Sequence, residues 1–360
     1  MVNDHPETLK LTIRDIAKEA DCSVATVSRV LNGGHHVSAE TRERVEEVIR
    51  QHEFQPNEKA RQMRQNGPQP IALVAKGAHN LFYAALIEAI AEELCQVGEI
   101  LTVHYVQEEE DELERAGRIL RLASPKGFLF LGGDSARFEA NFESLMKPAV
   151  WVTNDAKDLG LRGLDSVCTD DVEAARTAVS RLFDAGHREI CVLGGSEEMS
   201  QISKARLQGA KLAFAERGLL FDANQRWYPC PFNLEAGAKT FERLQKEQPE
   251  CTALFILADI LAFGALRKAY DLHLKVPEDL SMISFDGIQI GRYGSLRLTA
   301  IAQDERALAK QAVGDLLDRL AGDPFVRPGR HTKIAFSWQE GETLRPLRQM
   351  RRKSLAQKLN

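Results

Sequence analysis

A short stretch near the amino terminus constrains the fold of this chain more than any other part of it. Residues 12–31 read TIRDIAKEADCSVATVSRVL, in which two short helical patterns flank a break at Asp21 and Cys22. The apolar positions of the first pattern share one helical face: Ile13, Ile16, Ala17 and Ala20. Those of the second pattern point back at the first: Val27, Val30 and Leu31. With Thr12 and Ser23 as candidate amino-terminal caps, the pattern predicts a helix-turn-helix unit.

The second helix of this unit leaves short side chains and one arginine on its outer face: Val24, Ala25, Ser28 and Arg29. In helix-turn-helix proteins the second helix lies in the major groove, where its outer side chains reach the base edges. The sequence therefore predicts double-stranded DNA as a partner. A homodimer of such units would bind a pseudo-palindromic operator.

Three motifs in this region resemble the LacI/GalR family of bacterial transcription regulators. They are Thr-Ile-x-Asp-Ile-Ala from residue 12, Ser-Val-Ala-Thr-Val-Ser-Arg-Val-Leu-Asn from residue 23, and Val37-Ser38-x-x-Thr41-Arg42. Similarity continues through Phe54-x-Pro56-Asn57 and, more weakly, to about residue 345. The chain departs from the family pattern in the turn, where the family often has Gly and this chain has Asp21. Asp tolerates a left-handed backbone better than most residues, so we expect the turn to survive.

The resemblance implies roles for individual residues of this headpiece. Val24 and Ala25 occupy the two main base-reading positions, where they offer apolar contact such as that with a thymine methyl. Arg29 is the polar reader and is suited to a guanine. Thr12, the candidate cap of the first helix, is also expected to contact DNA. Phosphate contacts are implied for four polar residues: Ser23, Thr26, Ser28 and Asn32.

Residues 57–68 are expected to form a hinge helix and linker. In the family this helix lies in the minor groove and wedges an apolar residue into a central CpG step. By the resemblance, Asn57 begins the DNA-contacting segment and Met63 falls at the wedge position. Ala60, one turn before Met63, would let two hinge helices approach closely. A helix this short is marginal alone, so we expect it to fold only when the dimer and DNA hold it.

From residue 71 onward, apolar strands alternate with amphipathic helices, which predicts parallel sheets with helices on both faces. The expected strands are 71–75, 100–106, 128–131, 149–152, 166–168, 189–193, 226–228, 253–257, 281–285 and 299–302. The expected helices include 81–96, 172–185, 204–217, 234–246 and 305–320. About ten strands fit two sheets better than one.

The predicted fold class is therefore α/β, with an all-α helix-turn-helix headpiece followed by a two-lobed core. The resemblance implies a core like that of a type I periplasmic sugar-binding protein, whose lobes exchange chain near residues 161–164 and 287–297 and again near the carboxyl terminus. The expected domains are a headpiece, a hinge, an effector-binding and dimerisation domain and a basic, disordered tail: 1–56, 57–68, 69–345 and 346–360.

Candidate effector contacts follow the expected strands at their carboxyl ends, where open α/β sheets bind ligands. After the first and fourth strands these are His79, Asn80, Phe82, Thr153 and Asn154. By the resemblance, Arg206 grips sugar hydroxyls or a carboxylate, Phe232 stacks on the ligand and Asp286 accepts from hydroxyls. Asp259 either contacts the ligand or caps its own helix.

The small-molecule effector is expected to be a sugar or a sugar derivative, and a purine, a nucleoside or an organic acid remains an alternative. Induction and co-repression use the same parts, so the sequence leaves the sign of the response open. A solute-binding transport protein would share the two-lobed fold, but the attached headpiece and the lack of a signal pattern argue against it.

Composition narrows the other function classes. The formal net charge is −5, and residues 1–67 hold 10 basic and 11 acidic residues, so the DNA prediction depends on the motifs and not on charge. The six cysteines are widely spaced, so we expect free thiols and no metal site. No cofactor-binding or catalytic motif is present, so no enzyme activity is predicted. Without a signal peptide or a long apolar run, we expect a cytoplasmic protein with no membrane partner.

Overall fold

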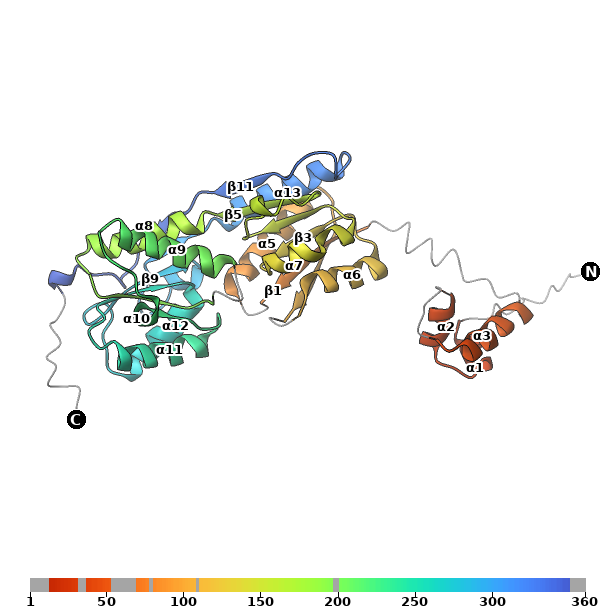
Figure 1. Ribbon diagram of the computed structural model, residues 1–360, viewed down its shortest axis with the longest axis horizontal. Coiled ribbons are helices and arrows are strands. Elements are labelled where there is room, and N and C mark those ends of the chain that lie inside the picture. The colour runs from red at the N-terminus through yellow and green to blue at the C-terminus, as the bar shows by residue number, and fades with distance from the viewer. Residues whose placement is uncertain are drawn as a thin grey trace, which may run out of the picture. The chain divides into compact units, whose positions relative to one another are not determined.

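The computed structural model describes residues 13–31, 37–52, 69–77, 80–107, 110–196 and 201–349. The chain divides into two compact units, Met1–Pro68 and Gln69–Asn360 (Figure 1). The structure describes the first residues of the expected basic tail, where Leu347–Gln349 form the short helix η4 and not a disordered segment. The expected hinge helix and the rest of the tail, from residue 350, lie outside the described residues. So do six of the predicted site residues: Thr12, Asn32, Asn57, Ala60, Met63 and His79.

The amino-terminal unit contains three helices, α1 (Ile13–Glu19), α2 (Val24–Leu31) and α3 (Ala39–Gln51). Ser38 caps α3, because its side chain accepts a hydrogen bond from the backbone N–H of Thr41. The apolar faces of the three helices form one small core: Ile16, Ala17, Ala20, Val27, Val30, Val45 and Val48. The predicted inward-facing residues of α1 and α2 that the structure describes therefore lie in this core.

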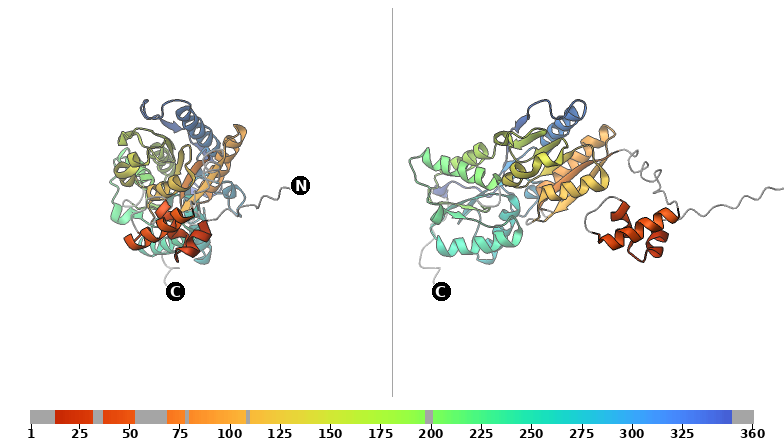
Figure 2. Two further views of the ribbon diagram at one scale, coloured as in Figure 1. Left: turned by 90° about the vertical axis from the view of Figure 1, so that its right-hand side faces the viewer. Right: turned by 45° about the vertical axis from the view of Figure 1, so that its right-hand side comes forward.

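The first lobe of the second unit is built on a six-stranded sheet in the order β11-β5-β4-β3-β1-β2, in which every pairing is parallel. The strands are β1 (Ile71–Lys76), β2 (Leu101–Val106), β3 (Phe128–Leu131), β4 (Ala149–Val152), β5 (Leu164–Thr169) and β11 (His331–Ile334). Helices α5 (Leu81–Gln96) and α13 (Glu305–Leu320) pack on one face (Figures 1 and 2). Helices α6 (Glu112–Ala123) and α7 (Ser135–Asn141) pack on the other.

The second lobe has a similar sheet in the order β12-β10-β9-β8-β6-β7, which is parallel except for β12. Its strands are β6 (Ile190–Leu193), β7 (Trp227–Tyr228), β8 (Ala253–Ile256), β9 (Ser281–Asp286), β10 (Ala300–Ala302) and β12 (Ser337–Gln339). Helices α8 (Asp171–Asp184) and α9 (Gln201–Ala215) cover one face, and α11 (Leu234–Glu247) and α12 (Asp259–Asp271) cover the other. Shorter helices are η1 (Phe142–Leu145), η2 (Lys157–Leu159), α10 (Ala223–Arg226), η3 (Gln289–Arg292) and η4 (Leu347–Gln349).

The chain crosses between the lobes three times, after β5, after β10 and after β11. The first two expected crossing positions were wrong. Residues 164–169 form the buried strand β5 of the first sheet, so the first crossing comes after residue 169 and not near residues 161–164. Residues 287–297 connect two strands of the second sheet, so the second crossing comes after residue 302.

The crossing segments are bonded to one another. The hydroxyl of Thr169, at the end of β5, donates to Oε1 of Gln303 over 2.8 Å. Nζ of Lys333, in β11, lies 2.9 Å from Oδ2 of Asp170 in the first crossing. These contacts connect the first crossing segment to the second and to the third, and the three segments together form the interlobe hinge. Among the described helices, none has the length and apolar character that a membrane span requires.

Candidate functional site

The turn between α1 and α2 has the geometry that the sequence suggests. Asp21 has a φ of 46°, a left-handed conformation that Asp tolerates through its short polar side chain. Oγ of Ser23 accepts a hydrogen bond from the backbone N–H of Thr26 over 3.1 Å, so Ser23 caps α2 as predicted. The cap fixes where α2 begins, and therefore which of its side chains lie on its outer face.

Two candidate reading residues on α2 are open to solvent. Val24 is 41% exposed, whereas the other two valines of α2, Val27 and Val30, are buried. Arg29 is also exposed, and within the described part of the chain no carboxylate forms an ion pair with it. Ala25 and Ser28 lie on the same helix. An exposed valine and an exposed guanidinium on one helix suit contact with a thymine methyl and a guanine edge.

The second unit contains a cavity of about 430 Å³ that residues of both lobes line. Six predicted effector residues lie in its walls: Asn80, Phe82, Thr153, Arg206, Phe232 and Asp286. They come from both sheets, at the carboxyl ends of parallel strands or in the segments that follow, as expected of an open α/β sheet. Among the described residues, the walls do not include Asn154 or Asp259.

Several wall residues were missed in the sequence, although each has a neighbour that could have indicated it. Tyr83 directly follows Phe82, and Ser203 lies one helical turn before Arg206 on α9. Gln303 follows the last residue of β10, which makes it another side chain at a strand's carboxyl end. Lys76 is the final residue of β1. A charged residue at that position looks like the end of a strand, so the sequence did not indicate that it lines a cavity.

Arg206 is the centre of a buried ion cluster at the second-lobe end of the cavity. Its Nε donates to Oδ1 of Asp171 over 2.7 Å, and its Nη1 lies 3.6 Å from Oδ1 of Asp286. Nη1 also donates to the carbonyl oxygen of Leu257. The guanidinium carbon lies 3.5 Å from the centre of the Phe285 ring, so the planar group is stacked as well as bonded. Burial raises the pKa of Asp286 to about 6, against the opposing effect of Arg206.

Asp259 has a structural position that neither sequence interpretation anticipated. It is fully buried, and its carboxylate accepts from the hydroxyl of Ser284 over 2.5 Å and from the N–H of Ile288 over 2.8 Å. Ala258 occupies the cap position of α12, and no side chain bonds there. Burial and the nearby Asp286 raise the pKa of Asp259 to about 8. Asp259 thus holds the end of β9, on which the cavity residue Asp286 lies.

Gln201, the first residue of α9, binds the first lobe directly across the cleft. Its Oε1 accepts from the N–H of Asp155 over 3.0 Å, and its Nε2 donates to the carbonyl oxygen of Asp155 over 2.8 Å. Nδ2 of Asn154 donates to the same Oε1 over 3.3 Å. Asn154, predicted as a ligand contact, therefore takes part in a bridge between the lobes.

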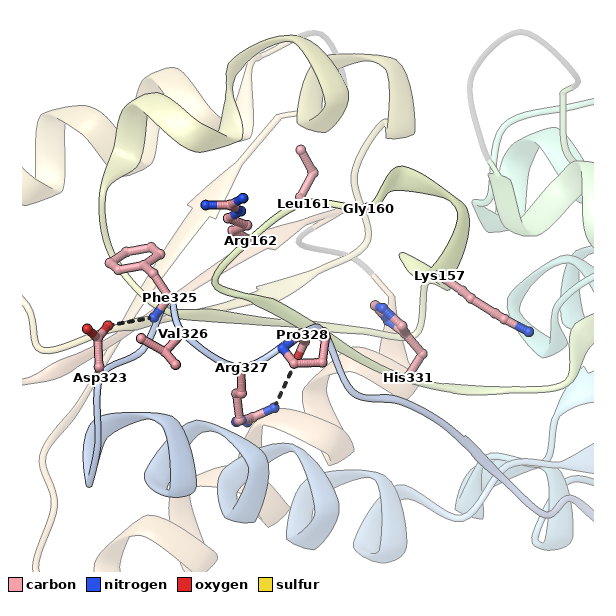
Figure 3. A pocket seen from close by; sticks show the side chains of 11 residues that line it. Lys157, Gly160, Leu161, Arg162, Asp323, Phe325, Val326, Arg327, Pro328 and His331 are labelled. Atoms are coloured by element: carbon pink, nitrogen blue, oxygen red, sulfur yellow. Dashed lines mark hydrogen bonds between the residues drawn. The ribbon is translucent and has the colours of Figure 1, made fainter.

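A second cavity, of about 840 Å³, lies in the first lobe between residues 157–162 and 323–331 (Figure 3). Arg162 and Phe325 are among the side chains on its facing loops. These loops precede β5 and β11, so the cavity lies at the amino ends of the strands. It is the larger of the two, but the cavity between the lobes lies where α/β sheets bind ligands and holds the predicted residues.

Comparison with known proteins gives matches over both units. The family model "Bacterial regulatory proteins, lacI family" matches residues 12–57, and a periplasmic binding protein-like domain matches residues 179–356. The Ribose operon repressor of Haemophilus influenzae is 30% identical to this chain, over 86% of this chain and 92% of its own length. The HTH-type transcriptional repressor CytR of Escherichia coli is 32% identical, over 86% and 90%. The chain belongs to the lacI family of bacterial regulatory proteins.

Solved structures of lacI-family proteins have the same fold. A lac repressor dimer bound to operator matches with a TM-score of 0.68 at 24% identity, over 92% of this chain and 98% of that chain. A complex of the regulator CelR with cellobiose matches with a TM-score of 0.67 at 22% identity, over 92% and 99%. The predicted family, fold class and general function as a DNA-binding transcription regulator are confirmed.

Proposed function

We propose that this lacI-family regulator is a repressor that binds a pseudo-palindromic operator as a homodimer and responds to a sugar-type effector in the cleft. The observation that carries the proposal is the cavity of about 430 Å³ lined by both lobes, in a chain that also holds a helix-turn-helix unit. A ligand that contacts both lobes binds one lobe arrangement better than another, which is the requirement for a switch.

On the DNA side, we assign base reading to Val24, Ala25 and Arg29. The exposure of Val24 and Arg29 supports this assignment. The remaining DNA contacts follow from the family resemblance alone: Thr12, Ser23, Thr26, Ser28, Asn32, Asn57, Ala60 and Met63. We place the protein in the cytoplasm, where its operator lies, and assign it no catalytic activity.

On the effector side, the cavity walls contain the aromatic residues Phe82 and Phe232 and the polar residues Asn80, Thr153 and Asp286. Aromatic faces with a few placed polar groups suit a hydroxylated ring. Two solved relatives support the sugar class, because one is described with bound ribose and another with cellobiose. His79 is proposed as a further contact by resemblance.

The test is selection of duplexes from a random pool by the full-length protein, followed by titration of the selected sequence. We expect a two-fold symmetric site with a central CpG, and a sugar that raises the melting temperature should also change operator affinity. Enrichment of no sequence over the pool, with attraction that only salt concentration changes, would contradict the proposal.

A further inference from the structure

We propose that the effector is a hydroxylated ring that carries no carboxylate or phosphate group, because each lysine or arginine that the structure describes in the cleft wall is already paired with a buried carboxylate. The inference rests on the proposed effector cleft and narrows the class of molecule that it takes. Among the described residues that line the cavity, the cationic ones are Lys76 and Arg206. Each of them is paired with a carboxylate.

At the second-lobe end, one guanidinium faces two carboxylates. Arg206 bonds Asp171 over 2.7 Å and lies 3.6 Å from Asp286, and all three side chains are less than a tenth exposed. A third N–H direction is taken by the carbonyl of Leu257. The one guanidinium is thus shared between two buried carboxylates, and no uncommitted positive charge remains at this end of the cavity. An anionic ligand would therefore meet a guanidinium that is already paired.

At the first-lobe end, Lys76 is committed in the same way. Its Nζ lies 3.3 Å from Oε2 of Glu112 and donates to the carbonyl of Glu110 over 3.1 Å. Glu112 is 1% exposed and also accepts from the N–H of Asp134. Arg137, which does not line the cavity, lies 3.7 Å from Glu112 and 3.6 Å from the carboxylate of Asp134. Two cations therefore balance two carboxylates, and no net positive charge remains for a ligand.

A ligand carboxylate or phosphate in this cavity would lose water without gaining an uncommitted cation. Buried charges without a partner are strongly unfavourable, whereas hydroxyl groups need only hydrogen-bond donors and acceptors. The walls supply such atoms at Asn80, Tyr83, Thr153 and Asp286, and they also include the aromatic side chains of Phe82 and Phe232. The site therefore suits an uncharged sugar or nucleoside and rejects sugar acids, sugar phosphates and nucleotides.

The experiment measures thermal shifts of the full-length protein at pH 7.5 and constant ionic strength with matched pairs of probes. The pairs are ribose with ribose 5-phosphate, cellobiose with cellobionate, and adenosine with adenosine 5′-monophosphate. We expect at least one uncharged member to raise the melting temperature by about 4 °C or more at saturation, with its anionic partner at least about tenfold weaker. An anionic member that binds as tightly as its uncharged partner, or more tightly, would overturn the inference.

Two variants connect the result to the charges. Asp286→Asn removes one of the two carboxylates opposite Arg206, so we expect weaker binding of the uncharged probe and a smaller difference between the members of its pair. Asp323→Asn is the control, because it changes a carboxylate of the other cavity. The amide oxygen of the new asparagine can still accept from the N–H of Phe325, so we expect this variant to keep the wild-type preference. An unchanged preference in Asp286→Asn would contradict the stated cause.

The outcomes separate this inference from the proposed function. A phosphorylated probe that binds and changes operator affinity would contradict the charge argument, but it would still support the proposed function as an effector-controlled regulator. DNA binding without sequence preference, together with a clear preference for uncharged probes, would contradict the proposed function and support the charge argument. If none of the probes raises the melting temperature of the wild-type protein, the cleft is not a site for hydroxylated rings and the inference fails.

Discussion

Asp259 and Asp286 share one desolvated site at the end of β9, and their titration affects the whole fold. Burial raises the pKa of Asp286 to about 6 and that of Asp259 to about 8, while in the unfolded chain both return to about 4. Between pH 4 and pH 8 the folded state therefore holds protons that the unfolded state has released. Stability contributed by this protonation is present at low pH and is lost as the pH rises through that window.

We accordingly expect the free energy of unfolding to be about 1–2 kcal/mol lower at pH 8 than at pH 6.5 because of Asp259. Burial lowers the pKa of His187 below its usual value, which moves the titration of this histidine toward the acid side of the interval. Denaturant titrations at the two pH values should show a smaller decline in Asp259→Asn and the full decline in the exposed control Asp158→Asn. Equal declines in both variants would contradict the assignment.

Arg29 permits a second test at the level of one side chain. If it reads a base, Arg29→Ala should cost about 1–3 kcal/mol on the selected operator and relax the preference at one base pair in each half-site. The control is Arg50→Ala on α3, where the arginine lies 2.8 Å from Glu47 on the same helix. Affinities for a set of single-base operator variants provide the measurement. A uniform loss on every duplex would instead indicate a phosphate contact.

Among the elements, those with long apolar patterns were predictable and the short polar ones were not. The helices 81–96 and 305–320 and the strands 128–131 and 149–152 have the predicted bounds. The sequence prediction missed β11 and β12, because HTKI and SWQ are short and only partly buried, with no clear alternation. Without β11, residues 164–169 had no visible partner on their far side, which explains the misplaced first crossing.

The candidate site shows the same division between local and distant information. Six described cavity residues were predictable from their places after strands or from the resemblance. Contacts between distant residues were not. Asp165 is fully buried between Arg319 and Arg327, which follow it by more than 150 positions, and nothing in the local pattern around Asp165 indicates them. Charged partners that meet only after folding have no periodicity to detect.

Helices α8 and α9 approach so closely that one glycine decides their packing. A Cβ added at Gly209 would lie 2.2 Å from the carbonyl oxygen of Val172, which belongs to the backbone of α8. We expect Gly209→Ala to lower the free energy of unfolding by about 1–3 kcal/mol through this overlap. Gly314→Ala is the control, because that exposed position of α13 has no atom within 4 Å. The control should gain up to about 1 kcal/mol from helix propensity in denaturant titrations, and a loss there would contradict the argument.

At the scale of the whole second unit, Gln201 connects two lobes that the chain joins only through the hinge. Its amide is paired with both backbone groups of Asp155, so the contact exists only while the lobes are close. We expect Gln201→Ala to weaken effector binding about three- to tenfold, because the closed arrangement loses about 1 kcal/mol. Its free energy of unfolding should change little, since the lobes keep their own cores.

Calorimetric titration with a binding sugar and denaturant unfolding together test this expectation. Gln225→Ala, at an exposed position of α10, provides the matched control. If Gln201→Ala folds normally and binds the effector as tightly as the wild-type protein, Gln201 does not stabilise the closed arrangement. A large loss of stability together with the loss of affinity would instead assign Gln201 a general structural role.

The three passages between the lobes also determine the order in which the protein can mature on the ribosome. The sheet of the first lobe receives its covering helix α13 from residues 305–320 and its edge strand β11 from residues 331–334 of a 360-residue chain. Until these emerge, β1 to β5 lack one edge and part of one face, whereas the helix-turn-helix unit has left the exit tunnel long before. In a nascent chain the helix-turn-helix segment is thus complete before the sensor is, and a chain cut short after β10 would lack both α13 and β11.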